Sequence, residues 1–429
     1  MALDEPPVGG HGYGAGRIGL CLRLVLEAGV SLRGVPRVLQ TLNRVLGWSL
    51  PVPCWTTGRL WLLRLGHAML TAALQGAGDW AWLIDHSVQI GRDKCLVILG
   101  IRLVDLPAVG QSLRQEDLHL IALVPGADWK ARQVDEALEK AAVRTGVPRV
   151  IVDDHGADIR GGVGLFQQRH PRTVEIYDAK HKAACLLKHR LENDPRWQLF
   201  QSRVGQTRCA VQQTELAFLS PPGPKLKARF MNLSPLLRWG KHMVAILRHA
   251  PPAVVERVLP ERLRDKLGWI EGFAAELEVW SQWQEVVDLT VTLVNQHGLY
   301  PGVADLLARR LSQRPALAES ARQLAADLLE FVRSQEARIE PGERFPGSTE
   351  VLESCFGRFK QLEKQQSRGG FTSLLLGFGA LLGRIATASI CQAMRHSRTP
   401  HVRQWVQQTL GRTLFAQRQR AFASATELG

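Results

Sequence analysis

The sequence lacks the cysteine patterns of disulfide-bonded and zinc-binding proteins. Its 429 residues include seven cysteines, and no two of them form a CxxC pair. They are scattered along the chain at Cys21, Cys54, Cys95, Cys185, Cys209, Cys355 and Cys391. An odd, unpatterned set of cysteines argues against a disulfide framework and against a zinc finger, and it indicates a reducing compartment.

Long apolar runs and a secretory leader are also missing. The most apolar run, residues 374–385, is interrupted by glycine and falls short of the roughly 20 residues that span a bilayer. The opening residues, MALDEPPVGGHGYG, are acidic and rich in glycine and proline, without the basic-then-apolar order of a signal peptide. We therefore expect a soluble protein of the cytoplasm that makes no membrane contact.

Acidic residues are scarce relative to basic ones. The chain has 54 lysine and arginine residues against 40 aspartate and glutamate residues, which gives a formal net charge of +14. A surplus of this size favours polyanionic partners, and nucleic acid is the first candidate. The length of the chain allows two or three domains, each with a core of its own.

The N-terminal part of the chain predicts a small helical module. Residues 1–15 are expected to form a disordered tail, and three helical patterns with short turns follow before residue 66. This spacing fits a helix-turn-helix-like DNA-binding domain over residues 16–75, and a three-helix bundle without DNA contacts is the alternative. Four polar residues of the third helix would then contact DNA, namely Thr56, Thr57, Arg59 and Arg64.

From residue 80 the pattern changes to strands alternating with helices. Short apolar runs predict strands over residues 80–85, 94–104, 119–124, 148–154 and 173–177. Amphipathic stretches predict helices over residues 129–144, 162–169 and 180–192. Three opening strands followed by alternating helices and strands form a mixed α/β sheet flanked by helices, which is the order of the RNase H fold. We assign the first part of this domain to residues 76–232.

The remaining chain divides into three parts. Residues 233–345 show amphipathic helices and no strand pattern, which predicts an all-helical insertion. Residues 346–392 are assigned to the final part of the sheet domain, and residues 393–429 to a basic C-terminal tail. The insertion has four tryptophans, which we expect in its core, with base stacking as the alternative: Trp239, Trp269, Trp280 and Trp283.

The segment STEVLESCFGRFK, which starts at Ser348, predicts an amphipathic helix with Ser348 as its N-cap. Its apolar stripe consists of Leu352, Cys355, Phe356, Phe359 and Leu362. Glu353 and Lys360 fall along one edge of this stripe, whereas Glu350 lies further round, towards solvent. A carboxylate at such an edge can bind a metal while the helix stays anchored; an ordinary surface helix is the alternative.

Three carboxylates stand out against this predicted fold. Asp85 ends the first strand, Asp154 ends the fourth strand, and Glu353 lies on the late helix. The first and fourth strands of an RNase H-like sheet are neighbours, so Asp85 and Asp154 would lie side by side. Two close carboxylates need cations to remain ionised, and a pair of Mg²⁺ ions suits in-line phosphoryl displacement. Asp153 is the alternative to Asp154, and Asp178 is expected to cap the helix after it.

Four segments resemble the DDE transposases of bacterial insertion sequences, whose catalytic domains are RNase H-like. They lie between about residues 78 and 390 and read WLIDHSVQIG, VIVDDHGADIRGG, EIYDAKHKAACLLK and STEVLESCFGRFK. In that family an Asp precedes His-Gly or Arg-Gly after the fourth strand, which favours Asp154 over Asp153. The late helix often carries a Glu, six residues and then a Lys, as Glu353 and Lys360 do. The Tyr and Arg that often precede this Glu are not matched here.

The resemblance implies metal-dependent cleavage at the ends of an insertion sequence, followed by attack of a 3′-hydroxyl on target DNA. Asp85, Asp154 and Glu353 would bind two Mg²⁺ ions, with Mn²⁺ as a substitute, and Lys360 would lie near phosphate. The implied partners are double-stranded DNA, as terminal inverted repeats and as target, and a second copy of the chain in a homodimer on DNA, within a bacterial nucleoid. An RNase H-like nuclease or resolvase that only hydrolyses, and a non-catalytic DNA-binding descendant, are the alternatives.

Overall fold

The chain divides into two compact units, each described here by itself. The computed structural model describes residues 7–8, 11–90, 93–223, 230, 232–314, 316–365, 371–383, 385–411 and 414–426. Unit 1 comprises Met1–Pro107, Ser112–Ile176 and Thr349–Gly429, and unit 2 comprises Ala108–Gln111 and Tyr177–Ser348. Unit 1 therefore contains the sheet, both ends of the chain and the late helix.

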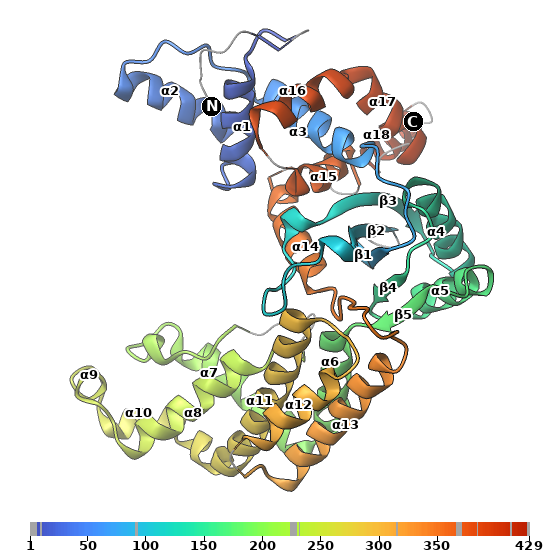
Figure 1. Ribbon diagram of the computed structural model, residues 1–429. Helices are drawn as coiled ribbons and strands as arrows, with labels where there is room; N and C mark the ends of the chain where they lie inside the picture. Colours follow the sequence, from blue (N-terminus) through green and yellow to red (C-terminus); the bar gives the residue numbers. More distant parts are fainter. Residues whose placement is uncertain are drawn as a thin grey trace. The chain divides into compact units, whose positions relative to one another are not determined.

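A five-stranded mixed sheet is the centre of unit 1 (Figure 1). Its strands are β1 (Trp80–Ile90), β2 (Asp93–Arg102), β3 (His119–Ala127), β4 (Val150–Asp153) and β5 (Val174–Tyr177). They lie in the order β3-β2-β1-β4-β5, with β1 antiparallel to β2, β2 antiparallel to β3, and β1 parallel to β4. This is the strand order of the RNase H fold, so the predicted α/β architecture is confirmed.

One face of the sheet is covered by α4 (Ala131–Thr145) and α5 (Ala157–Arg169). Trp82 and Ile84 of β1 belong to the same apolar core as Leu138 of α4 and Phe166 of α5. The two helices approach closely, because a Cβ atom added at Gly162 of α5 would lie 2.4 Å from the Cβ of Val134 in α4. A glycine at this position therefore permits the packing.

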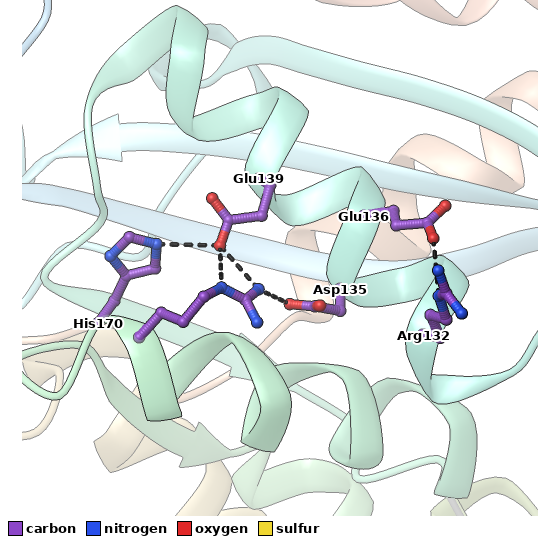
Figure 2. Close-up of polar contacts among 6 residues, drawn as sticks. Arg132, Asp135, Glu136, Glu139 and His170 are labelled. Carbon is purple, nitrogen blue, oxygen red and sulfur yellow. Dashed lines mark hydrogen bonds and ion pairs between the residues drawn. The ribbon is translucent and has the colours of Figure 1, made fainter.

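Ion pairs also join α4 to α5. Arg169 donates hydrogen bonds to Asp135 and to Glu139, and His170 Nε2 lies 3.0 Å from Glu139 Oε1 (Figure 2). Although burial alone would raise it, the hydrogen bonds from Arg169 and His170 hold the pKa of Glu139 below its ordinary value. The carboxylates of this group are therefore neutralised by protein side chains.

The late helix, α14 (Glu350–Glu363), packs against β1. All five residues of the predicted apolar stripe are buried, and Glu350 is exposed, as expected. The predicted N-cap is wrong by one residue, because Thr349 precedes the helix. The Ser348 hydroxyl instead lies 3.4 Å from Asp178 Oδ2 within unit 2.

Unit 1 also contains helices from both ends of the chain. They are α1 (Ala15–Leu26), α2 (Gly34–Leu46), α3 (Trp55–Leu70), α15 (Gly377–Leu382), α16 (Thr387–His396), α17 (Thr399–Thr409) and α18 (Leu414–Thr426). The central one is α3, which contacts α1, α15, α16 and α17 and is buried from Trp61 to Ala68 (Figure 1). A Cβ atom added at Gly66 would lie 1.7 Å from the Leu376 carbonyl oxygen, so α3 meets the C-terminal segment backbone to backbone. Residues 16–75 therefore share their packing with residues that follow the sheet.

The expectation of a disordered tail is wrong for residues 7–8 and 11–14. Pro7 and Gly14 form a β-bridge, and Val8 is buried. The ring of Tyr13 lies edge-on to Trp61 of α3, with 5.2 Å between centroids. The described part of this segment is thus folded onto α3. The basic C-terminal tail is likewise helical over α17 and α18.

Unit 2 is helical, as predicted for the insertion, but it begins at residue 177 rather than 233. Its α-helices are α6 (Ala179–Leu191), α7 (Pro195–Val211), α8 (Ser234–Arg248), α9 (Pro252–Val255), α10 (Pro260–Leu267), α11 (Ala274–His297), α12 (Val303–Ser312) and α13 (Glu319–Glu336). Asp178 caps α6 by accepting a hydrogen bond from the His181 backbone N–H, as expected. Trp239, Trp280 and Trp283 are buried in its core and Trp269 packs against them, which confirms their packing role.

Short 3₁₀ helices complete the connections. They are η1 (Leu103–Asp105), η2 (Gln115–Asp117), η3 (Ala217–Leu219), η4 (Gly268–Phe273) and η5 (Ser373–Leu376). None of the helices in the described ranges combines the length and apolarity that crossing a bilayer requires.

Candidate active site

The register between β1 and β4 aligns Asp85 with Asp154. Ala81, Trp82 and Leu83 pair in parallel with Val150, Ile151 and Val152. Asp85 in β1 and Asp154 just after β4 each follow the last paired residue of their strand by two positions. Side chains alternate between the faces of a strand, so Asp85 shares the face of Leu83, opposite the Trp82 and Ile84 side chains that contact α4 and α5.

Asp85 and Asp154 line the same pocket. It has a volume of about 250 Å³, and its described lining consists of Asp85, His86, Lys94, Asp154, Gly156, Asp158 and Ile159. Three carboxylates thus face one ammonium group and one imidazole. Carboxylates gathered in this way favour a cation, because each disfavours the ionised form of the others.

The turn after β4 fixes Asp153 and Asp154 separately. The His155 backbone N–H donates to Asp153 Oδ1 at 2.7 Å, and the Gly156 backbone N–H donates to Asp154 Oδ1 at 2.9 Å. His155 has a φ of 56°, in the left-handed region, which turns the chain sharply directly after Asp154. Asp153 is fully buried, whereas Asp154 is half-buried and reaches the pocket.

A hydrogen bond from β1 to α5 closes one side of the pocket. His86 Nε2 lies 3.0 Å from Asp158 Oδ2, and Lys94 Nζ lies 3.8 Å from the same oxygen. Burial lowers the pKa of His86 below its ordinary value, against the opposing effect of Asp158 and Asp154. The His86 backbone N–H also donates to Asp85 Oδ1 at 2.6 Å, which orients that carboxylate.

Asp158 and Lys94 also line the pocket, although the sequence did not predict them there. Asp158 follows Asp154 by four residues and lies in the first turn of α5. Lys94 comes from β2, the antiparallel neighbour of β1. The close spacing of Asp154 and Asp158 in the sequence could have indicated that Asp158 belongs to the pocket. Lys94 could be placed there only once the pairing of β1 with β2 was known.

Glu353 is half-buried on α14, the helix that packs against β1. It is not among the described residues that line the Asp85–Asp154 pocket. Lys360 is exposed on the same helix. The structure thus brings Asp85 and Asp154 together, and the role of Glu353 and Lys360 stays a prediction.

The residues of the pocket fit a hard divalent cation. Asp85, Asp154 and Asp158 offer carboxylate oxygens, which are the ligands that Mg²⁺ and Mn²⁺ prefer in proteins. A second group of metal-binding residue types lies close by in the chain. Ligand atoms of Asp153, His155 and Glu175 all lie within 4.8 Å of one another.

Of the four predicted DNA contacts, Arg64 is not available to a ligand. It is buried, and its guanidinium donates to the backbone carbonyls of Met394 and Ser397. We therefore correct its predicted role: Arg64 holds the C-terminal end of α16 against α3. Arg59 donates to Ser373 Oγ at 2.6 Å and is half-buried.

The other two predicted contacts lie in the first turn of α3. Thr56 is exposed and Thr57 half-buried. Their hydroxyls lie 2.9 and 3.1 Å from the Sγ of Cys54.

No protein-family model and no curated protein matches the chain. A solved structure described as "Drosophila P element transposase strand transfer complex" is similar to it, with 11% sequence identity and a TM-score of 0.39. The alignment covers 91% of this chain and 94% of that chain.

Proposed function

We propose that this chain is a DNA transposase of the DDE type, which cleaves the ends of an insertion sequence and joins them to target DNA. The observation that carries the proposal is the meeting of Asp85 and Asp154 in one pocket, two residues beyond the last pair of the parallel β1–β4 ladder in an RNase H-type sheet. Catalytic carboxylates at this edge suit phosphoryl transfer, because the reaction needs charge stabilisation and little covalent chemistry from the protein.

Each side chain of the proposed site has an assigned role. Asp85 and Asp154, with Glu353 as the third ligand, would hold two Mg²⁺ ions, with Mn²⁺ as a substitute. When bound, these ions activate a water or 3′-hydroxyl and stabilise the leaving oxygen. His86 and Asp158 orient the Asp85 side of the pocket through their 3.0 Å contact. Lys94 brings a positive charge to the position where a phosphate would enter.

DNA contact is assigned to two surfaces of unit 1 that are poor in acids. The first joins α2 to the first turn of α3, where Arg37, Arg44, Trp48 and Thr56 are exposed and no acidic residue occurs between Glu27 and Asp79. The second covers α16 to α18, where the exposed basic residues are Arg395, Arg398, Arg403, Arg418 and Arg420. Exposed arginines attract phosphate, and aromatic side chains stack on sugars and bases.

The same account assigns the partners. Double-stranded DNA serves both as terminal inverted repeat and as target, and two copies of the chain act on the DNA within a bacterial cell. A nuclease or resolvase would use the same carboxylates, but it would only hydrolyse. A non-catalytic descendant would bind DNA and leave it intact.

One experiment separates these functions. The substrate is a labelled duplex that contains the DNA flanking the coding region, supplied intact or already cut to expose its 3′-hydroxyl. The protein, Mg²⁺ and a supercoiled plasmid are added. Joining of the label to the plasmid supports a transposase. Cleavage of the intact duplex without joining supports the nuclease, and binding without either product supports the non-catalytic protein.

A further inference from the structure

We infer that Asp153, His155 and Glu175 form a second metal site, separate from the Asp85–Asp154 pocket, which takes a divalent transition-metal ion such as Zn²⁺. The inference does not rest on the proposed function. It rests on the convergence of three side chains of ligand type from two neighbouring strands and the turn between β4 and α5.

The distances between the ligand atoms are close to those found around a bound ion. The ligand atoms of the three residues lie within 4.8 Å of one another, and His155 Nε2 lies 3.6 Å from Glu175 Oε1. Ligand atoms about 2.0–2.2 Å from one ion lie about 3–3.5 Å apart. The His155–Glu175 pair is already near this spacing, and small side-chain rotations would close the rest.

The backbone pre-positions two of the ligands. Asp153 is the last residue of β4, and its Oδ1 is held by the His155 backbone N–H at 2.7 Å. The left-handed φ of His155 lets the imidazole turn back towards β5, where Glu175 lies. The ion would therefore bind a turn that is already folded.

The donor set selects the kind of ion. Two carboxylates and one imidazole suit Zn²⁺ or Mn²⁺, whereas Mg²⁺ and Ca²⁺ prefer oxygen alone. The side chains of His155 and Glu175 are 19% and 13% exposed, and Asp153 is fully buried. Two carboxylates this sheltered from water repel one another, and a divalent cation offsets that repulsion more fully than one protonated histidine.

An ion bound at the second site would fix the position of Asp154. This residue stands between two of the ligands in the chain, so an ion bound by Asp153 and His155 would fix the peptide that carries it. Asp154 would then be held by the second site while its side chain faces the first.

A matched pair elsewhere in unit 1 provides the control. His170 and Glu139 are likewise a histidine and a glutamate in contact, with 3.0 Å between Nε2 and Oε1, but Arg169 donates to Glu139 and Asp135 and supplies the positive charge (Figure 2). This group needs no cation, so His170→Asn should leave metal binding unchanged. Any weak binding of Zn²⁺ by surface histidines would be equally visible in this variant.

The test is titration of chelator-treated, untagged protein with Zn²⁺, by calorimetry and by equilibrium dialysis with elemental analysis. The wild type and His170→Asn should bind Zn²⁺ with equal affinity. Glu175→Gln and His155→Asn, in which Asn tolerates the left-handed backbone, should bind at least tenfold more weakly. Zn²⁺ should raise the melting temperature of the wild type and not that of Glu175→Gln.

The outcome is independent of the catalytic proposal. In Asp85→Asn the second site should keep its Zn²⁺ affinity, whatever happens to DNA cleavage. Equal Zn²⁺ binding by Glu175→Gln and the wild type would overturn the inference, and so would a wild type that binds no Zn²⁺. In that case the 3.6 Å contact between His155 and Glu175 is an ion pair only.

Discussion

Asp85 lies within β1, which continues to Ile90, and Asp154 directly follows β4, yet the two carboxylates line one pocket. The parallel register brings this about, since each follows the last paired residue of its strand by two positions. Two carboxylates in this relationship are the basis of the proposed catalytic centre.

Removing either charge should separate binding from chemistry. Asp85→Asn and Asp154→Asn keep the size of the side chain but lose a charge that a divalent cation requires. Both variants should fold and bind duplex DNA at least as tightly as the wild type, because carboxylate–phosphate repulsion falls. Both should lose Mg²⁺-dependent cleavage in a gel assay. Retained cleavage with either variant would contradict the assignment.

Replacing Asp158 should change the titration of His86. Burial lowers the pKa of His86, and the Asp158 carboxylate partly opposes this effect across their 3.0 Å contact. Asp158→Asn should therefore lower the pKa of His86 further, as measured by NMR of ¹⁵N-labelled histidine. The exposed Asp305→Asn serves as control and should change nothing. A higher pKa of His86 in Asp158→Asn would contradict the described geometry.

Glu363 should destabilise the protein as the pH rises. Burial raises the pKa of this α14 carboxyl to about 7, although Lys360 acts in the opposite direction. Because the pKa is higher in the folded than in the unfolded state, protonation of Glu363 stabilises the folded state. This stabilisation is fully present below about pH 4 and is lost as the pH rises through 7. Glu363→Gln should match the wild type in acid and be more stable at pH 8, by at most about 3 kcal/mol.

Denaturant unfolding at several pH values measures this difference. Glu336→Gln is a poor control, because Glu336 accepts hydrogen bonds from the Gly302 and Ala304 backbone N–H groups. The exposed Glu330→Gln on α13 is suitable. A difference between Glu363→Gln and the wild type that does not grow with pH would contradict the prediction.

Replacing Arg64 should lower the stability of the protein, whereas replacing Arg44 should lower its affinity for DNA. Arg64→Met leaves the Met394 and Ser397 carbonyls without their donor and should cost about 2–3 kcal/mol of stability. Arg44 is exposed on α2, so Arg44→Met should leave stability within about 0.5 kcal/mol. It should instead lower DNA affinity and reduce the salt dependence by about one phosphate contact. If Arg64→Met lowered DNA affinity without loss of stability, and Arg44→Met did not lower it, Arg64 would be the DNA contact after all.

The strands and the stripe of α14 could be read from the sequence because their signals are local. Val150–Asp153 is a short run that is buried throughout, and Leu352 and Phe359 recur at helical spacing. The start of unit 2 could not be read, since a helix that follows the last strand can either cover the sheet or begin a separate unit, and α6 and α7 belong to unit 2. The position of Arg64 depends on carbonyls from a segment more than 300 residues away. The grouping of Asp153 with Glu175 depends likewise on which strands are neighbours.

The most direct test of the central claim concerns Glu353, the third proposed ligand. Glu353→Gln is compared with Glu350→Gln, which alters an exposed carboxylate on the same helix. The measurement is the rate of Mg²⁺-dependent cleavage of a duplex with the flanking sequence, at equal DNA occupancy. We predict a loss beyond the roughly 10–100-fold typical of outer-shell changes for Glu353→Gln, and wild-type rates for Glu350→Gln. Wild-type cleavage by Glu353→Gln would contradict the three-carboxylate centre.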